Sequence, residues 1–284
     1  MYSTSQLMKV MKRSIYCSDI ASRIVSHLSP NLADRSGELQ EQEVSILGIP
    51  ISNLTMQELL EKLTHGIVFT PNVDHLMKLR QHPEFREAYL AADYRTCDSK
   101  IVLKAAQFLD KPLKEKVSGS DLFPAFCKHH KYNGEVKIFL LGGSSEEATQ
   151  AAHDNINRKT GRHIITASYC PPFGFEADEA ECQRIVDAIN RSGANVLAVG
   201  VGAPKQELWI VKYRDRLPNI KIFMAVGATI NFEAGLQKRS PAWISELGLE
   251  WLHRLLSEPR RLWKRYLIDD LPFLWLILKQ KFSQ

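Results

Sequence analysis

Asn195-Val-Leu-Ala-Val-Gly-Val-Gly-Ala-Pro-Lys-Gln-Glu-Leu-Trp-Ile210 is the most informative segment of this chain of 284 residues. Its apolar run predicts a buried strand, and the glycines at positions 200 and 202 predict a tight turn after it. Pro204 then opens an amphipathic stretch, and proline is favoured in a first helical turn because its missing N–H would have no partner there. Backbone N–H groups and a positive dipole end meet at such a turn, so an anion such as a diphosphate can bind there. An ordinary strand-to-helix connection in a parallel sheet explains the same spacing.

The composition is that of a globular protein, with 44% hydrophobic and 24% charged residues, and it excludes a largely disordered chain. The length allows one large core or two smaller ones. The net charge of +5 is a mild excess and predicts no nucleic-acid partner. Five cysteines, an odd number without a C-x-x-C pair, predict neither a disulfide framework nor a zinc site. A reducing cytoplasm fits this cysteine usage best.

No secretory signal is expected, because the basic residues near the N-terminus precede no continuous apolar run. No stretch reaches the roughly 18 uninterrupted apolar residues that span a bilayer. The longest candidate, Leu271–Leu278, is too short and contains Pro272. We therefore expect a protein that is soluble or lies on a membrane without crossing it.

Three regions follow from the pattern along the chain: a polar N-terminal extension (1–42), an α/β domain (43–238) and a Leu- and Trp-rich helical appendage (239–284). Short apolar runs alternate with helical patterns in the middle region, which predicts a doubly wound, mainly parallel α/β sheet. The expected strands are Val44–Leu47, Ile67–Thr70, Tyr94–Cys97, Val136–Leu141, Ile164–Ser168, Val196–Val201 and Ile222–Val226. The expected helices cover 54–64, 73–92, 100–109, 120–131, 145–159, 178–192 and 204–216.

Small and polar residues gather where the expected strands end. Ligands of doubly wound sheets bind beyond the carboxyl ends of the strands, so we predict one shared cleft there. The strand-end groups are Thr70-Pro71-Asn72, Cys97-Asp98, Gly142-Gly143, Gly200-x-Gly202 and Gly227-Ala228-Thr229.

Each of these groups has a chemical and a structural interpretation. Asp98 can accept a proton from a bound hydroxyl group, or it can cap the helix that follows. Thr70 and Asn72 can bind a sugar or a base, or they can cap the helix that starts at Val73. Gly142-Gly143-Ser144-Ser145 suits a phosphate cradle, while Ser144 with Glu147 also matches a capping box.

Two common nucleotide motifs are incomplete or missing. Lys205 occupies the place of the third glycine in a dinucleotide fingerprint, so NAD binding is weakly supported. No two aspartates have the i, i+2 spacing of many metal-dependent sugar transferases. The charge of a departing diphosphate would then be stabilised by N–H groups, Gln206 and cations rather than by Mg²⁺.

The appendage combines charge with apolar residues. Five cations stand against one anion between Arg254 and Arg265, on a helical pattern that Pro259 divides in two. One interpretation is a solvated face with Glu250–Arg254 and Glu258–Arg261 pairs. The other is a basic amphipathic surface for phosphate and anionic lipid, with the tryptophans at positions 263 and 275 entering the membrane interface.

With these motifs assembled, the chain resembles the WecG/TagA/CpsF family of bacterial glycosyltransferases. The similarity runs from about Val44 to Tyr266. It rests on Thr70-Pro-Asn-Val-Asp-His75, Val117-Ser-Gly-Ser-Asp-Leu122, Leu140-Leu-Gly-Gly143, Gly200-Val-Gly-Ala-Pro-Lys-Gln-Glu207, Gly227-Ala-Thr-Ile-Asn-Phe-Glu-Ala-Gly235, Arg239-Ser-Pro-x-Trp243, Gly248-Leu-Glu-Trp-Leu-His-Arg-Leu255 and Glu258-Pro-x-Arg261.

The resemblance implies an inverting, metal-independent transfer of a sugar from a UDP-sugar to a polyprenyl-diphosphate-linked sugar on the cytoplasmic membrane face. It also implies a Rossmann-like fold whose helical appendage completes the site. The family's proposed base falls on Asp98. Its Thr, Asn and Gln site residues fall on Thr70, Asn72 and Gln206, and its appendage arginines fall on Arg254, on Arg261 and on either Lys264 or Arg265.

Three positions depart from the family pattern. Ser99 follows the expected base where the family has glycine. Lys116 replaces an arginine, and lysine lacks the planar fork that holds a phosphate bidentately. Asn231 stands where aspartate is common, in a position that can contact uracil. These departures leave the reaction class intact and weaken any inference about the sugar.

We therefore expect a UDP-sugar transferase of envelope or exopolysaccharide synthesis, peripheral to the inner membrane face, without a cofactor or metal and possible as a homo-oligomer. The sugar is a hexose, N-acetylmannosamine or its uronic acid. An NAD-dependent oxidoreductase and a non-catalytic peripheral scaffold are the alternatives.

Asp98 is the expected catalytic residue. The expected donor-binding residues are Thr70, Asn72, Gly142, Gly143, Gly202, Lys205, Gln206, Gly227 and Asn231. The expected acceptor- and phosphate-binding residues are Lys116, Arg254, Arg261, Lys264 and Arg265.

Overall fold

The computed structural model describes residues 43–237, 240–241, 244 and 248–283. The chain separates into two compact units, Met1–Glu43 and Val44–Gln284. The extension expected over residues 1–42 lies outside the described residues. The sheet and the candidate site described below lie in the second unit.

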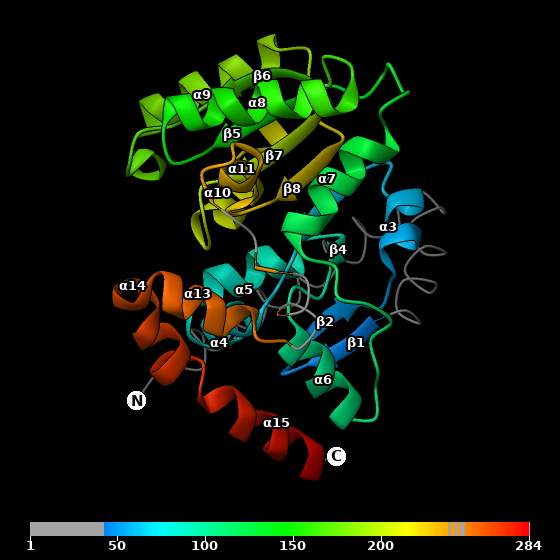
Figure 1. The fold of residues 1–284 in the computed structure, drawn as a ribbon, viewed down its shortest axis with the longest axis vertical. Coiled ribbons are helices and arrows are strands. Elements are labelled where there is room, and N and C mark those ends of the chain that lie inside the picture. Colours follow the sequence, from blue (N-terminus) through cyan, green and yellow to red (C-terminus); the bar gives the residue numbers. More distant parts are fainter. Residues whose placement is uncertain (1–42, 238–239, 242–243, 245–247, 284) are drawn as a thin grey trace, which may run out of the picture. The chain divides into compact units, whose positions relative to one another are not determined.

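A six-stranded sheet forms the centre of the second unit (Figure 1). Every neighbouring pair of strands is parallel, so the predicted doubly wound parallel sheet is confirmed. The strand order is β4-β3-β8-β7-β5-β6. The strands are β3 (Gly66–Phe69), β4 (Tyr94–Arg95), β5 (Ile138–Gly142), β6 (Ile165–Tyr169), β7 (Val196–Gly200) and β8 (Ile222–Ala225).

The first expected strand does not belong to this sheet. β1 (Glu43–Ile46) pairs with β2 (Ile49–Ser52) in a separate two-stranded sheet. Leu47 and Gly48 turn the chain between them with positive φ values of 51° and 77°. We did not predict β2, because Pro50 interrupts its apolar run and proline cannot donate to a strand ladder.

Helices cover both faces of the six-stranded sheet, and side chains alternate along each strand between two apolar clusters. Val68 packs in one cluster and Phe69 in the other; Ala198 and Leu197 divide in the same way. One cluster includes residues of α4 (Val73–Gln81), α5 (Pro83–Leu90), α6 (Lys100–Phe108), α9 (Glu179–Arg191) and α10 (Lys205–Tyr213). The other includes residues of α3 (Met56–Lys62), α7 (Gly119–His129), α8 (Glu146–Thr160) and α11 (Thr229–Glu233).

The single helix expected over 73–92 is two helices. Proline disfavours a helical conformation in the residue before it, and His82 is accordingly extended, with φ −121° and ψ 97°. Pro83 then starts α5 in a position where its missing N–H costs nothing. We also did not predict α11, whose five residues are too few to show a helical period.

The pattern predicts two helices in the appendage, divided at Pro259, whereas its described residues form three short helices and a π-helical turn. The break at Glu258 is confirmed, between α13 (Glu250–Ser257) and α14 (Pro259–Lys264). The π-helical turn η3 (Arg265–Asp269) follows, then α15 (Pro272–Phe282). Within the described residues, none of the helices combines the length and apolar character that crossing a bilayer requires.

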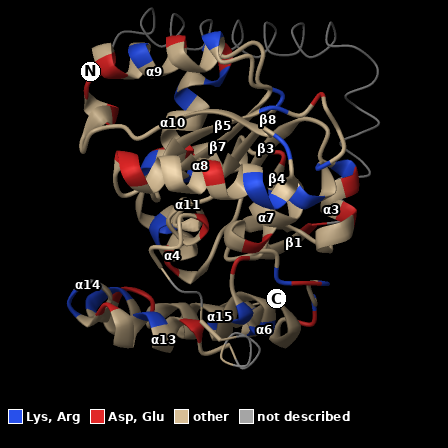
Figure 2. Cartoon of the chain, turned by 45° about the horizontal axis from the view of Figure 1, so that its top comes forward, with Lys and Arg blue, Asp and Glu red and all other residues tan. Residues whose placement is uncertain are grey.

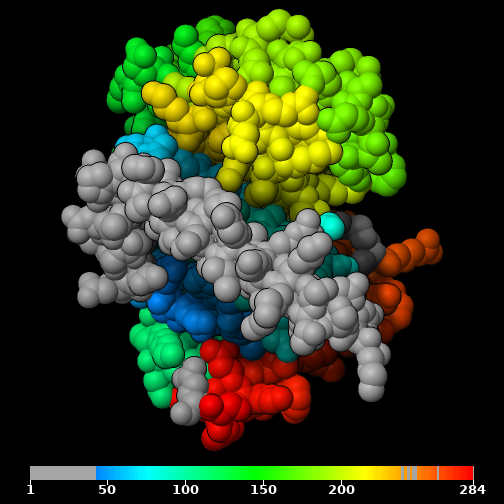
Figure 3. Space-filling view, turned by 180° about the vertical axis from the view of Figure 1, so that it is seen from behind, coloured from blue at the N-terminus to red at the C-terminus, as the bar shows by residue number. Residues whose placement is uncertain are grey.

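Helix α15 packs against the domain through contacts with residues that are far away in the sequence. Its Phe273 and Ile277 are buried in the core cluster that holds α4, α5 and α10. The Gln280 amide oxygen accepts the Leu47 N–H at 2.9 Å, and its amide nitrogen donates to the Ser45 carbonyl at 3.1 Å. The last residues of the chain, red in Figure 3, therefore belong to the folded unit.

Candidate active site

The glycine turns lie where the direction of the strand connections reverses. From β5 the chain moves outward to the edge strand β6, whereas from β7 it moves inward to β8. Such a switch point between adjacent strands is where doubly wound sheets bind their ligands. Gly142 and Gly200 face each other across it, and a Cβ on Gly142 would lie 2.6 Å from the Gly200 carbonyl carbon. Only glycine permits this close approach of the two backbones.

The loop after β5 is held by side chains from two helices. The Thr149 hydroxyl group donates to the Gly142 carbonyl at 2.6 Å, and a Cβ on Gly143 would collide with that hydroxyl. Ser145, not Ser144, is the N-cap of α8, so the expected Ser144–Glu147 capping box is wrong by one residue. Asn231 accepts the Ser144 N–H at 3.0 Å. Asn231 therefore shapes the cradle that we predicted from its glycines.

Gln206 is buried at the N-terminal end of α10, with 3% of its surface exposed. Its amide oxygen accepts the Gly227 N–H at 3.1 Å, and its amide nitrogen donates to Glu207 at 2.8 Å. Gln206 thus ties the helix that follows β7 to the turn that follows β8. The Gly227 N–H, which we expected to bind the donor, is already used by Gln206.

Lys205 turns toward the loop that follows β6. It forms an ion pair with Glu176, and its ammonium lies 4.6 Å from the ring centroid of the fully exposed Phe173. Pro204 precedes α10 as its N-cap, one position before the first turn in which we expected it. Lys205 therefore lies close to the glycine turn in the sequence but pairs with the loop that follows β6.

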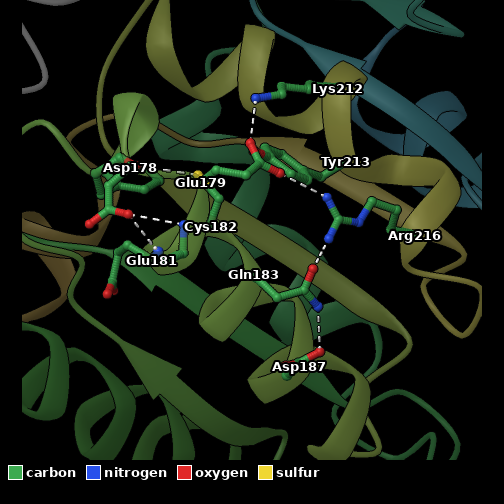
Figure 4. Close-up of polar contacts among 11 residues, drawn as sticks. Asp178, Glu179, Glu181, Cys182, Gln183, Asp187, Lys212, Tyr213 and Arg216 are labelled. Atoms are coloured by element: carbon green, nitrogen blue, oxygen red, sulfur yellow. Dashed lines mark hydrogen bonds and ion pairs between the residues drawn. The ribbon is translucent and has the colours of Figure 1, made fainter.

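The far end of α10 is fixed by an exposed polar network with α9 (Figure 4). The Glu179 carboxylate accepts hydrogen bonds from Lys212 at 3.0 Å, Tyr213 at 2.8 Å and Arg216 at 3.1 Å. These bonds lower the pKa of Glu179 to about 2. With Gln206 bound at one end and Glu179 at the other, α10 is held in place over its whole length.

Asp98 lies between β4 and α6, and its backbone N–H donates to the Pro71 carbonyl at 3.0 Å. The N-cap of α6 is Ser99, which accepts the Ile101 and Val102 N–H groups, so the capping interpretation of Asp98 is wrong. The Asp98 carboxyl group forms no hydrogen bond or ion pair within the part of the chain that the structure describes. Burial raises its pKa to about 7.

Four charged residues surround the Asp98 carboxyl group. Lys116 and Arg254 work against the rise of its pKa, while Glu250 and Asp121 reinforce it. Lys116 has an 11% exposed side chain, and its ammonium lies 3.3 Å from Glu250 and 3.5 Å from Asp121. Glu250 thus pairs with Lys116 across the fold, rather than with Arg254 on its own helix as the surface interpretation assumed.

Thr70 and Asn72 lie on the loop beside Asp98. Thr70 is buried at the end of β3, and its hydroxyl is 3.3 Å from where a Cβ of Gly119 would stand. Asn72 is the N-cap of α4 and accepts the His75 N–H at 3.1 Å, which confirms the capping interpretation. The Arg265 guanidinium also reaches the Asn72 side-chain oxygen, at 3.4 Å.

Of the two candidates for the third appendage cation, the structure brings Arg265 to the site. Its guanidinium lies 3.5 Å from the buried Asp74 carboxylate on α4, whereas the Lys264 side chain is exposed. Asp270 lies 3.9 Å from the Arg265 Nε. Burial raises the pKa of Asp270 to about 7, with Asp74 adding to the rise. The side chain of Arg261 lies outside the described residues.

The structure thus gathers two groups of residues at the carboxyl ends of the strands. Asp98, Lys116, Asn72, Arg254 and Arg265 lie beside β3 and β4; the glycine turns, Gln206 and Asn231 lie beside β8, β7 and β5. The sequence pattern missed the carboxylates that face these cations, Asp74, Asp121 and Glu250, because nothing local distinguishes them from solvated surface charges. Among the described residues, no three His, Cys, Asp or Glu side chains converge as metal ligands.

Comparisons with known proteins identify the family of this chain. A sequence model of the glycosyl transferase WecG/TagA/CpsF family matches residues 44–284. The chain is 28% identical over 251 residues to an N-acetylglucosaminyldiphosphoundecaprenol N-acetyl-β-D-mannosaminyltransferase of Staphylococcus aureus strain MRSA252, which covers 84% of this chain and 93% of that protein. The protein of the same name from strain MW2 is 27% identical over 249 residues, with the same coverage.

Proposed function

Because this chain belongs to the WecG/TagA/CpsF family of glycosyl transferases, we propose that it moves a sugar from a UDP-sugar to a polyprenyl-diphosphate-linked sugar. N-acetylmannosamine is the first candidate for the sugar and N-acetylglucosaminyl-diphosphoundecaprenol for the acceptor, since both relatives carry these groups in their names. A neutral hexose and N-acetylmannosaminuronic acid are the other candidate sugars.

The observation that carries this proposal is the Asp98 carboxyl group, which has a pKa of about 7 and no partner among the described residues. A general base works best when its pKa lies near the working pH. Asp98 takes the proton of the acceptor hydroxyl group while that oxygen bonds to the anomeric carbon of the donor. The bond from the anomeric carbon to the UDP oxygen breaks in the same step. A single displacement of this kind inverts the anomeric configuration.

The departing UDP carries negative charge that must be stabilised without a metal ion in this proposal. Gln206 keeps an amide hydrogen for it, and Lys116, Arg254 and Arg265 bring positive charge to the same end of the sheet. Preorganised donors and cations in a partly desolvated cleft are effective at this task. Chelation of divalent ions should therefore leave transfer intact.

The appendage suits a membrane-bound acceptor. Its outer surface exposes large apolar side chains, with Trp275 62%, Leu271 61% and Phe282 83% exposed. Lys and Arg residues accompany them on α13, α14 and α15 (Figure 2). Apolar insertion and attraction to anionic lipids together give peripheral binding. We propose that this surface holds the enzyme on the cytoplasmic face of the membrane.

Incubation of the purified chain with radiolabelled UDP-sugars and a lipid-diphosphate N-acetylglucosamine acceptor tests the proposal. We expect transfer from one UDP-sugar, unchanged by EDTA, with inversion visible in the one-bond carbon–proton coupling at the product's anomeric centre. Retained configuration would contradict the single displacement, and loss of activity in EDTA would contradict metal independence. No transfer from any of the three sugars would overturn the function itself.

A thermal-shift comparison separates the nucleotide classes. A ligand of the native state raises the unfolding temperature, so UDP should stabilise the protein and NAD should not. Stabilisation by NAD alone would favour an oxidoreductase on the same sheet. Membrane binding without transfer by any variant would favour a non-catalytic scaffold.

A further inference from the structure

Two neighbours fix the orientation of the Gln206 amide, because one is a hydrogen-bond donor and the other is an acceptor. The Gly227 N–H can only donate, so it must face the amide oxygen, at 3.1 Å. The Glu207 carboxylate oxygen at 2.8 Å serves as an acceptor, so the amide nitrogen must face it. A flipped amide would place donor against donor and acceptor against acceptor. The two contacts therefore leave one orientation.

These two contacts use the amide oxygen and one of the two amide hydrogens of Gln206. An amide nitrogen carries two hydrogens, and one of them is donated to Glu207. The second is directed by the planarity of the amide once the first is fixed. Gln206 lies directly after the glycine turn at the β5/β7 switch point, so its amide lies at the end of the sheet where we expect the donor to bind.

A carboxyl group is unusual at the buried position that Glu207 occupies. Only 1% of it is exposed, its Oε2 has no hydrogen-bond partner among the described residues, and burial raises its pKa to about 7. A buried carboxyl group with one unpaired oxygen costs stability. An apolar side chain of the same size would pack α10 against α5 without this cost, so the packing of α10 does not explain the carboxyl group. Among the described residues, Gln206 is the side chain that hydrogen-bonds to this carboxyl group.

We propose that Glu207 is a positioning residue, which holds the Gln206 amide so that a single N–H is aimed at the departing diphosphate. This inference rests on the proposed sugar transfer and adds a residue to it. An N–H that meets charge developing on the leaving group acts mainly in the transition state. Loss of the orientation should therefore lower kcat more than it raises KM for the UDP-sugar.

Two single variants of the full chain test the role of Glu207. Glu207→Leu keeps the volume and removes the acceptor, and we expect kcat to fall about 100-fold, the scale of one lost oxyanion donor. Glu207→Gln keeps an oxygen that can accept from Gln206, and we expect kcat within a few-fold of wild type. The matched control is Glu181→Leu, which removes another buried carboxyl group, on α9 (Figure 4), bound to Tyr169 and Arg184. This control should leave kcat unchanged.

A double variant in which residues 206 and 207 are exchanged, the swapped pair, tests the same role if Glu207→Leu fails to fold. In the double variant Gln206→Glu and Glu207→Gln, a carboxylate at position 206 accepts from Gly227 and from the new amide at position 207. The number of charges and of side-chain hydrogen bonds is unchanged, but no side-chain N–H remains at position 206. We expect a folded protein with an unfolding temperature near that of wild type and a kcat lowered at least as far as in Glu207→Leu.

The outcomes distinguish this inference from the function on which it rests. Wild-type kcat in the folded Glu207→Leu variant, or in the swapped pair, would overturn the positioning role while sugar transfer stands. An equal loss in Glu207→Leu and Glu207→Gln would also contradict it, because the retained acceptor should rescue. Absence of transfer in the wild-type protein would instead refute the proposed function.

Discussion

Lys116 and Glu250 are 134 positions apart in the sequence, and their ammonium and carboxylate groups lie 3.3 Å apart in the fold. The contact joins the loop before α7 to α13 of the appendage. Both residues act on the Asp98 carboxyl group, with opposite effects on its pKa. The appendage therefore contributes to the electrostatic environment of the expected base as well as to the outer surface.

The pH dependence of sugar transfer should report this arrangement. Asp98 must be ionised to accept a proton, and its pKa is about 7, so kcat/KM should rise with pH with a midpoint near 7. Lys116→Met removes a charge that lowers the pKa and should move the midpoint to higher pH. Glu250→Gln removes a charge that raises it and should move the midpoint to lower pH. Shifts in the same direction for both variants would exclude Asp98 as the titrating group.

Replacement of the base tests the chemical step directly. Asp98→Asn keeps the size of the side chain but cannot take a proton at neutral pH, and general-base catalysis contributes about 10²–10⁴-fold. We expect a loss of kcat in that range, with UDP binding measured by calorimetry changed little. Turnover at the wild-type rate would rule out this base. Ser99→Ala is the control for the local backbone, because it removes only the cap of α6.

The same carboxyl group should make stability depend on pH in a defined direction. The pKa of Asp98 in the folded protein, about 7, lies above the ordinary value of 3.8 for an aspartate. Its contribution to stability is therefore full below about pH 4 and is lost as pH rises through 7. Asp98→Asn avoids this loss and should raise the free energy of unfolding by on the order of 1–3 kcal/mol at pH 8, with little change at pH 4. Chemical denaturation at the two pH values measures the difference.

The variant Glu179→Gln should change the stability at pH 8 in the direction opposite to Asp98→Asn. Hydrogen bonds from Tyr213, Lys212 and Arg216 lower the pKa of Glu179, so its carboxylate stabilises the fold above its unfolded pKa and loses that effect as pH falls toward 2. Its neutral replacement should destabilise the protein at pH 8. A gain in stability for both variants at pH 8 would contradict the assignment of Asp98.

The parallel sheet and the strand-end residues were predictable because both depend on local pattern. Apolar runs such as Val196–Val201 fix a buried strand, and the residues after each run must lie at one edge of the sheet. Thr70, Asp98 and Gln206 were placed at that edge by this reasoning alone. The same reasoning was wrong at Pro83. The apolar period continues through 73–92, but the proline ends one helix and starts the next.

The partners of the site cations were not predictable from the sequence. Lys116 with Glu250, and Arg265 with Asp74, are joined only by the tertiary fold. On the helical pattern, Glu250 and Arg254 are four residues apart and look like an ordinary surface pair. Resemblance to the family left the third cation open between two neighbours. The Arg265 side chain reaches Asn72 at the start of α4 while that of Lys264 is exposed, so Arg265 is the cation that we propose for the site.

Removal of the appendage would be a poor test of membrane binding, because Phe273 and Ile277 are part of the core. Substitutions on the exposed face of α15 avoid this problem. Leu271→Glu with Trp275→Glu places two charges on side chains that are 61% and 62% exposed. Since the apolar contact is lost while the fold is kept, we expect sedimentation with phosphatidylglycerol vesicles to weaken about 10-fold or more.

The control for these substitutions is Tyr132→Glu, which adds a charge to a side chain that is 89% exposed on the loop between α7 and β5. It should leave vesicle binding unchanged. With a water-soluble, short-chain acceptor, the double variant should transfer sugar at the wild-type rate, because neither residue is one that we expect to bind donor or acceptor; with a long-chain acceptor in vesicles it should be slow. High salt should weaken the binding of the wild-type protein, since the cations of α13 and α14 act through a screened attraction. Vesicle binding that survives both the two charges and high salt would place the membrane contact on another face of the protein.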